Sequence, residues 1–440
     1  MSMAEQPGYQ ETDVGWIPVE WKVKCIGEMT DVSAGGTPAT SCDEYWNPPE
    51  VPWMSSGEVH LRRVYSTEKK ISKLGLSNSA AKIFPKKSVV MALAGQGKTR
   101  GCVAVLESEV ATNQSLAAIY PNEHFDTDFL FHNLDWRYQE LRALSSGEGG
   151  RGGLNLSIIK SVPIGLPPLS EQQKIAAILT VVDDKLDVIF LQIEATRTLK
   201  QGLMQTLFSR GVGTQDATGR WLPHSEFKDS ELGEIPVEWQ VVQLQTVSEV
   251  IRGASPRPQG DPRYYGGDVP RLMGADVTRD GKWVTPKIDF LTEEGAKRSR
   301  PCPRGTLTII CSGDVGVPSF LAVDACIHDG FLALINIDES QVNKEYLYHI
   351  IYSVKQRFYA SATHGGVFTN LTTGILKEFL VPLPQLAEQQ RISSILDVAD
   401  EKISTELRKQ KNYQTLKRGL MQKLLTGEWR VKLDSPTGIA

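Results

Sequence analysis

Leu166-Pro-Pro-Leu-Ser-Glu-Gln-Gln173 and Leu383-Pro-Gln-Leu-Ala-Glu-Gln-Gln390 are two copies of one segment, and this repeat decides the fold. Each copy opens a long stretch of patterned apolar residues. Each stretch ends in a second matched segment, Leu199-Lys-Gln-Gly-Leu-Met-Gln205 and Leu416-Lys-Arg-Gly-Leu-Met-Gln422. Because a repeat of this kind sets the architecture, we interpret the chain as an internal duplication.

The stretch between the matched segments predicts one long helix in each copy. In the first copy, apolar residues recur at alternating steps of four and three, a spacing typical of a coiled-coil seam. This stripe consists of Ile175, Leu179, Val182, Leu186, Ile189, Ile193, Leu203 and Leu207. The second stripe consists of Ile392, Leu396, Ala399, Ile403, Tyr413, Leu420 and Leu424, with Glu406, Gln410 and Lys417 interrupting it. Ser170 and Gln173 fit an N-terminal capping box. At 1.5 Å per residue each helix is about 58 Å long. We expect the two helices to pack antiparallel, with a globular module at either end.

A globular module precedes each helix. Glu11-Thr-Asp-Val-Gly-Trp-Ile-Pro-Val-Glu-Trp21 recurs as Asp229-Ser-Glu-Leu-Gly-Glu-Ile-Pro-Val-Glu-Trp239, and the register continues beyond it. Residues 86–93 and 305–311 are strand-like, whereas 128–144 and 344–359 have helical periodicity. The predicted fold class is therefore α+β, with two globular domains joined by two long antiparallel coiled-coil helices and a pseudo-twofold internal repeat.

These patterns define six segments. They are a first domain (1–166), a first long helix (167–210), a linker (211–228), a second domain (229–382), a second long helix (383–429) and a C-terminal tail (430–440).

Composition sets broad limits on the class of protein. The 440 residues carry a formal charge of -4, so any surface for a polyanion must be local. The six cysteines include no Cys-x-x-Cys pair, which argues against structural zinc and favours reduced thiols. The N-terminus resembles no signal peptide, and no apolar run approaches the roughly 20 residues that span a bilayer. We therefore expect a cytoplasmic protein with no membrane partner.

Two short motifs suggest enzymatic chemistry, and both are incomplete. Gly95-Gln-Gly-Lys-Thr99 resembles a phosphate-binding loop, but Ala92 stands where that loop needs its first glycine. Asn47-Pro-Pro-Glu50 differs by one residue from the tetrad of adenine-N6 methyltransferases, in which an aromatic fourth residue stacks on the flipped base. The sequence indicates neither a catalytic residue nor a cofactor or metal site.

Locally basic stretches favour contact with nucleic acid. Residues 82–106 contain five Lys or Arg and no acidic residue, and residues 251–304 contain eleven Lys or Arg against seven Asp or Glu. Cations bind phosphates, while Arg, Asn, Gln and Asp can read base edges. The predicted DNA-contacting residues are Lys98, Arg100 and Trp53 in the first module and Arg271, Asp276, Arg279 and Lys282 in the second.

The repeated segments together resemble those of the specificity subunits of type I restriction-modification systems. The motifs are Gly-x-Ile-Pro-x-x-Trp, Pro-x-x-x-Glu-Gln-Gln and Leu-Lys-x-Gly-Leu-Met-Gln, each present twice, and 94–101 also resembles a stretch of their target-recognition domains. The resemblance implies a non-catalytic subunit that binds a bipartite, asymmetric site on double-stranded DNA. It also implies two methyltransferase subunits and restriction-translocase subunits as partners, which would bind S-adenosylmethionine and ATP.

Two alternatives remain open at this point. The first is a self-contained adenine-N6 DNA methyltransferase that uses Asn47-Pro-Pro-Glu50. The second is a structural scaffold without DNA binding, suggested by the long helices and the acidic net charge.

Overall fold

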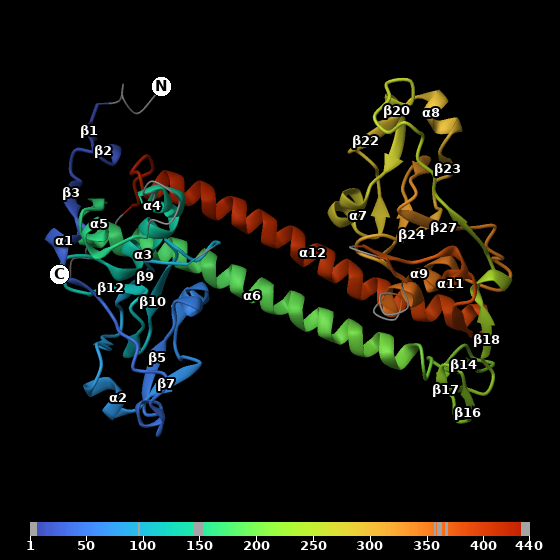
Figure 1. The fold of residues 1–440 in the computed structure, drawn as a ribbon, viewed down its shortest axis with the longest axis horizontal. Coiled ribbons are helices and arrows are strands. Elements are labelled where there is room, and N and C mark those ends of the chain that lie inside the picture. Colours follow the sequence, from blue (N-terminus) through green and yellow to red (C-terminus); the bar gives the residue numbers. More distant parts are fainter. Residues whose placement is uncertain are drawn as a thin grey trace, which may run out of the picture. The chain divides into compact units, whose positions relative to one another are not determined.

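The computed structural model describes residues 7–95, 97–144, 153–355, 358, 363–365 and 368–432. It divides into two compact units, 1–190 with 408–440, and 191–407. The two long helices, α6 (Leu169–Leu207) and α12 (Leu386–Leu424), each contribute to both units (Figure 1). The two 39-residue helices confirm the long helices expected from the repeat.

Unit 1 contains two sheets and a group of short helices. The five-stranded sheet has the order β4 (Val32–Ala34), β12 (Leu116–Ile119), β9 (Val89–Ala92), β10 (Val103–Leu106), β6 (Arg63–Val64). The four-stranded sheet has the order β7 (Lys69–Ile71), β5 (Val51–Met54), β11 (Val110–Thr112), β8 (Ile83–Phe84). The helices are α1 (Ile26–Met29), α2 (Lys73–Ser77), α3 (Thr127–Trp136), α4 (Tyr138–Leu144) and α5 (Leu156–Lys160). A hairpin of β1 (Tyr9–Thr12) and β2 (Gly15–Pro18) and a pair of β3 (Lys22–Cys25) and β13 (Pro163–Leu166) complete the unit.

Unit 2 repeats the strand order of both sheets. Its five-stranded sheet has the order β19 (Glu249–Arg252), β27 (Phe331–Ile335), β24 (Leu307–Ile310), β25 (Pro318–Leu321), β21 (Trp283–Val284). Its four-stranded sheet has the order β22 (Asp289–Leu291), β20 (Tyr265–Leu272), β26 (Ala325–Ile327), β23 (Arg300–Cys302). Its helices are α7 (Gly274–Asp280), α8 (Glu293–Lys297), α9 (Lys344–Ser353) and α11 (Thr373–Lys377). The hairpins are β14 (Thr214–Gln215) with β15 (Trp221–Leu222), β16 (Phe227–Ser230) with β17 (Gly233–Pro236), and β28 (Thr363–Gly365) with β29 (Phe368–Asn370), and β18 (Gln240–Gln243) pairs with β30 (Leu380–Leu383).

The helices pack antiparallel within each unit. In unit 1 the start of α6 shares a core with the end of α12, and that core includes Ile175, Leu179 and Leu424. In unit 2 the end of α6 shares a core with the start of α12, where Leu207 and Ile392 are buried. The predicted α+β class with antiparallel coiled-coil helices is therefore confirmed.

Local details differ from the sequence-based expectations. Segment 128–144, for which helical periodicity was predicted, is divided between α3, which ends at Trp136, and α4, which begins at Tyr138. The predicted linker contains the β14–β15 hairpin. Residues 433–440 of the predicted tail lie outside the described residues.

Candidate nucleic-acid interface

The Trp of Gly-x-Ile-Pro-x-x-Trp and the Glu of Pro-x-x-x-Glu-Gln-Gln form a hydrogen bond in each unit, and we call this contact the anchor. In unit 1 the indole N–H of Trp21 donates to Glu171 Oε2 at 3.3 Å, and both side chains are buried. Arg430 donates to both carboxylate oxygens of Glu171, at 2.8 and 3.0 Å. Charge-assisted, bidentate contacts of this kind are strong and directional. The segment after α12 is thereby tied to the first module.

Unit 2 has the same Trp–Glu contact, but His224 takes the place that Arg430 has in unit 1. Trp239 Nε1 donates to Glu388 Oε2 at 2.9 Å, and His224 Nε2 lies 3.0 Å from Glu388 Oε1. The backbone N–H groups of Val212 and Gly213 also donate to this carboxylate, at 2.8 and 3.0 Å. The segment after α6 is therefore held on the second module in the same way.

The glutamine that follows this Glu joins the long helix to the module helix. Gln172 Oε1 accepts from the backbone N–H of Asp126 at 2.9 Å, and Gln389 Oε1 accepts from that of Asn343 at 2.8 Å. Asp126 and Asn343 are the N-caps of α3 and α9. The capping-box prediction at Ser170 is wrong, because α6 begins at Leu169 and the backbone N–H of Glu171 donates to Pro168 O. The Glu-Gln pair binds the module instead.

A partly buried network of ion pairs is a further contact between module and long helix in each unit. In unit 1, Arg62 contacts Asp135 and Asp183 at 3.0 Å each, and Lys417 Nζ lies 2.6 Å from Asp183 Oδ1. His132 is buried beside them, with Nδ1 3.9 Å from Asp183 Oδ2. Burial lowers the pKa of His132 to about 4, so this imidazole is neutral. Burial alone would raise the pKa of Asp135, but Arg62 and Lys417 lower it below its usual value.

Unit 2 contains the corresponding network, in which Lys200 is the repeat counterpart of Lys417 and the other cation is Lys282. Lys282 Nζ lies 2.5 Å from both Glu345 and Asp397, and Lys200 Nζ lies 2.5 Å from Asp400 Oδ1. Burial opposes the charge on Lys282, yet its two carboxylate partners raise its pKa above the usual value. These contacts connect Lys282 and α9 of the module to α12, and α6 to α12.

His349, Asp397 and Asp400 also bring potential metal ligands within 4.8 Å of one another. His349 Nε2 lies 2.8 Å from Asp397 Oδ1. The ammonium groups of Lys282 and Lys200 already contact these two carboxylates, which therefore belong to the ion-pair network.

The predicted DNA-contacting residues of module 1 differ in accessibility. Lys98 is exposed on the loop after β9, where its carbonyl accepts from Tyr138 Oη at 2.7 Å, and Arg100 is half-buried. Trp53 is 5% exposed on β5. Its indole N–H donates to Gly36 O at 3.0 Å, and its ring packs edge-on against Trp46. Trp53 is therefore built into the module interior.

In module 2, the predicted residues fall into three places. Asp276 and Arg279 pair on α7 at 2.8 Å, with Asp276 buried and Arg279 exposed. Arg271 is buried on β20, 2.6 Å from Asp289 Oδ2 and stacked over the ring of Tyr265. Lys282 belongs to the ion network described above.

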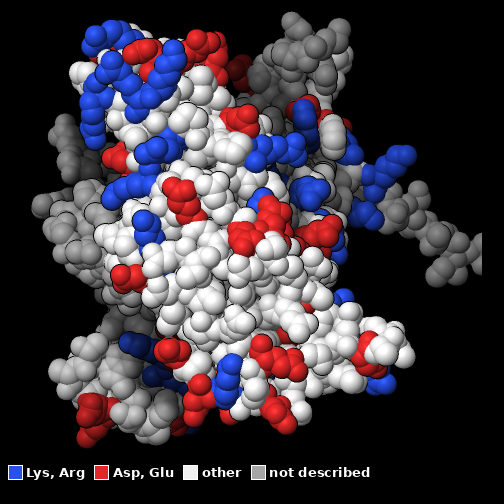
Figure 2. Space-filling model, turned by 90° about the vertical axis from the view of Figure 1, so that its right-hand side faces the viewer, with Lys and Arg blue, Asp and Glu red and all other residues white. Residues whose placement is uncertain are grey.

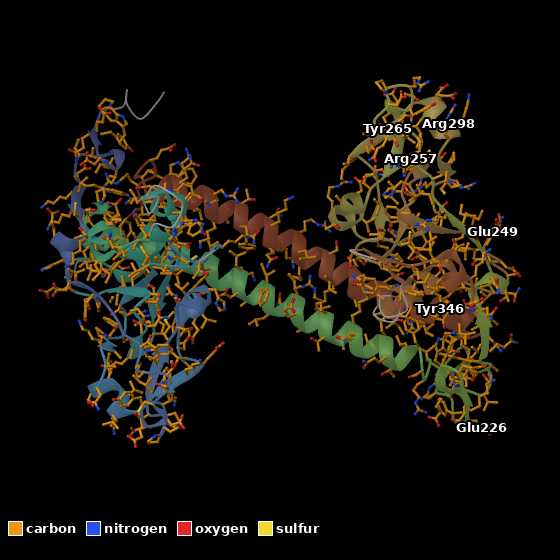
Figure 3. The ribbon with its side chains drawn as sticks, in the orientation of Figure 1. Glu226, Glu249, Arg257, Tyr265, Arg298 and Tyr346 are labelled. Carbon is orange, nitrogen blue, oxygen red and sulfur yellow. The ribbon has the colours of Figure 1, made fainter. Side chains whose placement is uncertain are left out.

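Exposed cations that we did not single out from the sequence surround the four-stranded sheet of unit 2. Figure 2 shows Lys and Arg gathering over the part of this unit that carries β20 and α8, and Figure 3 labels Arg257 and Arg298 there. Arg257, Arg263 and Arg298 have exposed side chains, and the last two lie over the ring of Tyr264. The excess of cations in 251–304 was the sequence signal for this surface.

The four-stranded sheet of unit 1 is also bordered by exposed lysines. They are Lys69 and Lys70 on β7, Lys73 on α2 and Lys82 before β8. Asn47-Pro-Pro-Glu50 lies beside this sheet, where Glu50 accepts from the backbone N–H of Lys73 at 3.1 Å and faces its ammonium group at 3.3 Å. That N–H, together with the Lys73 side chain, lowers the pKa of Glu50 below its usual value.

These features describe a duplicated protein in which two similar modules attach to shared helices through repeated anchors. The family model for the type I restriction modification DNA specificity domain matches the chain twice, at residues 18–195 and 236–417. The chain therefore belongs to this family, whose members are non-catalytic DNA-recognition components of type I restriction-modification systems. This membership contradicts the alternatives of a self-contained methyltransferase and of a scaffold without DNA recognition.

Individual relatives match nearly all of the chain or part of it. The type I restriction enzyme MjaVIII specificity subunit of Methanocaldococcus jannaschii is 24% identical over 98% of this chain and 98% of that protein. The EcoR124I/EcoR124II specificity subunit of Escherichia coli is 28% identical over 42% of this chain and 43% of that protein. The crystal structure of the type I S subunit from M. genitalium aligns with a TM-score of 0.59 at 16% identity, covering 92% of this chain and 96% of that one. No helix in the described ranges combines the length and apolarity that crossing a membrane requires.

Proposed function

We propose that each module of this chain reads one half of a bipartite, asymmetric DNA site, and that the two long helices set the spacing and hold the partner subunits. The observation that carries this proposal is the repeat itself. The two modules share strand order and anchors, yet differ in the side chains of the smaller sheet. Because the anchors of the two units are similar, the units can bind two copies of one partner. Because the two modules differ, they can recognise the two different halves of an asymmetric DNA site.

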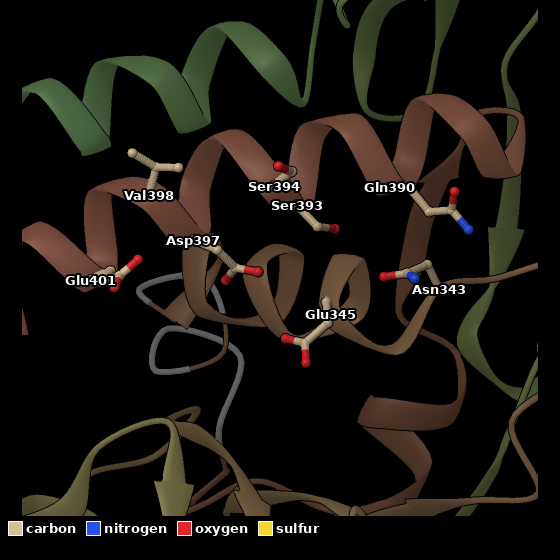
Figure 4. Close-up of a pocket in the computed structure, with 8 residues that line it drawn as sticks. All are labelled: Asn343, Glu345, Gln390, Ser393, Ser394, Asp397, Val398 and Glu401. Atoms are coloured by element: carbon tan, nitrogen blue, oxygen red, sulfur yellow. The ribbon is translucent and has the colours of Figure 1, made fainter.

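The four-stranded sheet and its flanking helix are the proposed DNA face of each module. Exposed cations border this sheet in both modules, and Arg over Tyr264 offers a planar donor set next to an aromatic ring. Such cations neutralise phosphates and such planar groups can read base edges. Arg279 on α7 stays a proposed contact, and so do Lys98 and Arg100, which lie on the loop after β9 of the five-stranded sheet. Because the side chains of Trp53, Arg271 and Asp276 are buried, we propose that they support the DNA-binding surface without contacting DNA. Lys282 is held by Glu345 of α9 and Asp397 of α12 (Figure 4), and we propose a structural role for it at the contact with α12.

One position illustrates how the two readers diverge. Trp53 on β5 pairs with Ala111, and Arg271 on β20 pairs with Cys326, at the same place in the two four-stranded sheets. The first module therefore packs an indole against Trp46 where the second packs a guanidinium against Tyr265. Because different side chains pack beneath the proposed DNA faces of the two modules, we propose that the two faces recognise different sequences.

The helices are the proposed assembly surface. Val181, Phe190 and Leu416 are exposed in unit 1, and their repeat counterparts Val398, Leu407 and Leu199 are exposed in unit 2. Exposed apolar side chains of this kind mark interaction sites. Because each unit offers the same three positions, we propose two methyltransferase subunits, one per unit, with restriction subunits recruited to that complex. S-adenosylmethionine and ATP would bind to those partners.

Module exchange in a cell that carries the complete system tests this proposal. Adenine methylation is mapped across the genome before and after residues 22–166 are replaced by the corresponding module of a relative. We expect one half of the methylated site to change while the other half and the spacing stay the same. A change in both halves or in neither would contradict the proposal. Methylation by the purified chain alone would also contradict it.

A further inference from the structure

One turn in each module joins the four-stranded sheet to the five-stranded sheet and has the same structure in both units. It connects β11 to β12 in unit 1 and β26 to β27 in unit 2. The turns comprise residues 113–116 and 328–331, and each is closed by a hydrogen bond between the backbones of its first and fourth residues, at 3.3 and 2.9 Å. The second residues of the turns are Gln114 and Asp329, and both are exposed. The repeat therefore presents one polar side chain at the same place in each module.

A repeated segment lies against each turn. Gly35-Gly-Thr-Pro38 in the first module recurs as Gly253-Ala-Ser-Pro256 in the second. The first glycine of each copy touches the backbone at the turn, because an added Cβ would lie 2.0 Å from the carbonyl oxygen of Thr112 or 2.1 Å from that of His328. Only glycine allows such a close approach of two backbones. The segment is thus fixed against the turn in the same way in both modules.

A hydroxyl group of this segment holds the exposed side chain of each turn. Thr37 Oγ1 donates to Gln114 Oε1 at 2.5 Å, and Ser255 Oγ donates to Asp329 Oδ1. A side chain that is already held in one conformation loses less entropy when it binds a ligand. Each turn therefore carries a polar group that is oriented before any ligand arrives.

Two of the buried residues predicted from the sequence to contact DNA fix the same segment from the interior of the modules. The indole N–H of Trp53 donates to Gly36 O at 3.0 Å. Arg271 Nη2 donates to Ser255 Oγ at 3.0 Å. Because Trp53 and Arg271 occupy equivalent positions on β5 and β20, the support behind the turn is also repeated.

An exposed cation stands beside each turn. Arg300 on β23 pairs in register with Ile327, the last residue of β26 before the turn. Its repeat counterpart is Lys82, which directly precedes Ile83, and Ile83 pairs with Ala111 on β11. Both cations are exposed. Each module thus places a group that can neutralise a phosphate next to a group that can reach a base edge.

The two exposed side chains have different hydrogen-bonding capacities. The amide of Gln114 offers donors and an acceptor, and within the described residues its nitrogen makes no hydrogen bond. The carboxylate of Asp329 can only accept, and the hydrogen bond from Ser255 lowers its pKa below the usual value. Asp329 Oδ2 lies 3.8 Å from Arg257 Nη2, which is beyond hydrogen-bond distance, and the side chain of Arg257 is 69% exposed (Figure 3). Both turn residues can therefore accept or donate further hydrogen bonds.

We propose that Gln114 and Asp329 are specificity-determining residues that each contact one base in the major groove. The amide of Gln114 binds N6 and N7 of an adenine, and the carboxylate of Asp329 accepts from the N4 amino group of a cytosine. Because phosphates repel a carboxylate, the DNA groups that Asp329 can bind are amino groups of bases. The inference rests on the proposed function, in which each module reads one half of the site.

Substitutions that keep the shape of the side chain test this inference. Gln114→Glu and Asp329→Asn change the donors and acceptors but keep an oxygen that accepts from the hydroxyl group. Glu109→Gln and Asp324→Asn are the matched controls, because these exposed repeat counterparts directly precede β11 and β26 at the opposite ends of the same strands. Methylated adenines are mapped in cells that carry the complete system with each variant. The purified complex is titrated with duplexes that carry each of the four base pairs at every position of the target.

We expect Gln114→Glu to lower discrimination at one position of one half-site by about tenfold or more, and Asp329→Asn to do so at one position of the other half-site. The spacing, the remaining positions and the sites of both controls stay unchanged. If either variant keeps its base preference at every position, or weakens binding to all sequences alike, or if a control changes the preference, the inference is wrong and the proposed function stands. If exchange of the first module leaves both half-sites unchanged, the proposed function fails and this inference fails with it.

Discussion

Lys200 on α6 places its ammonium group 2.5 Å from Asp400 Oδ1 on α12, inside unit 2. The counterpart pair in unit 1 exchanges the helices, because there Lys417 on α12 lies 2.6 Å from Asp183 Oδ1 on α6. The lysine side chains are 8% and 12% exposed, so each pair is largely withdrawn from water. A buried polar pair in a coiled coil penalises other registers and orientations, because misalignment would leave a charge without its partner.

Removing one member of this pair should cost far more than removing an exposed pair on the same helix. Lys200→Met leaves Asp400 without its cation, and we expect unit 2 to lose about 3 kcal/mol of unfolding free energy. The matched control is Arg197→Met, which breaks the exposed contact with Glu194 and should cost about 0.5 kcal/mol or less. The loss in each variant is measured by urea unfolding, with hydrogen exchange in α9 and at the start of α12 as the readout. Equal losses in the two variants would show that the buried pair has no special role.

The anchoring carboxylate of unit 2 should control the order of the segment after α6. Glu388→Ala leaves the N–H groups of Trp239, Val212 and Gly213 without their acceptor. Unsatisfied buried donors cost about 1–3 kcal/mol each, so we expect a loss of at least that size in unit 2. Amide exchange at Val212 and Gly213 should accelerate by about tenfold or more. Glu238→Ala, at a 54% exposed neighbour of His224, is the control and should leave that exchange unchanged.

The sequence predicted the duplication, the long helices and the fold class because these depend on repeated motifs and periodic apolar residues. It did not predict what the motifs do. The sequence predicted a capping box at Ser170 and Gln173. It assigned no role to Glu171 and Gln172 between them, which are buried against Trp21 and α3, distant in sequence. Lys417 read as an interruption of the apolar stripe because its partner Asp183 lies on the other helix. Tertiary partners of polar residues leave no periodic signal in the sequence.

The sequence was equally unable to predict which residues of the candidate DNA face are exposed. The count of cations located the basic stretch in the second module, but it could not separate exposed Arg279 from Arg271 and Lys282, which are occupied by Asp289 and by the ion network. Exposure depends on the packing of strands and helices, and local composition does not encode it.

The buried neutral His132 should make unit 1 sensitive to acid. Its pKa in the folded chain is about 4, below the ordinary value of 6.5, so the unfolded chain binds a proton that the folded chain does not. Stability is therefore complete above pH 6.5 and falls as the pH drops toward 4, by about 3 kcal/mol from this group. His132→Gln should remove this part of the pH dependence, whereas His124→Gln, at an exposed site, should keep it. Unfolding free energies compared at pH 7 and 4.5 check the difference between the two variants. An identical pH dependence in both would contradict the assignment of His132 as a buried neutral group.

Substitution of the exposed arginines of unit 2 should weaken DNA binding in a salt-dependent manner. Arg263→Ala and Arg298→Ala each remove a cation that lies over Tyr264 beside the four-stranded sheet. If each side chain neutralises one phosphate, the slope of log K against log salt should fall by about one per substitution, for cognate and unrelated DNA alike. Arg220→Ala, at an exposed position in the segment between α6 and the second module, is the control and should leave the slope unchanged. The measurement is a binding titration of the chain assembled with its methyltransferase subunits, at four or more salt concentrations. If the variant instead loses discrimination at one base pair of the target, the arginine reads a base. If neither the salt slope nor the affinity changes, the arginine does not belong to the DNA face.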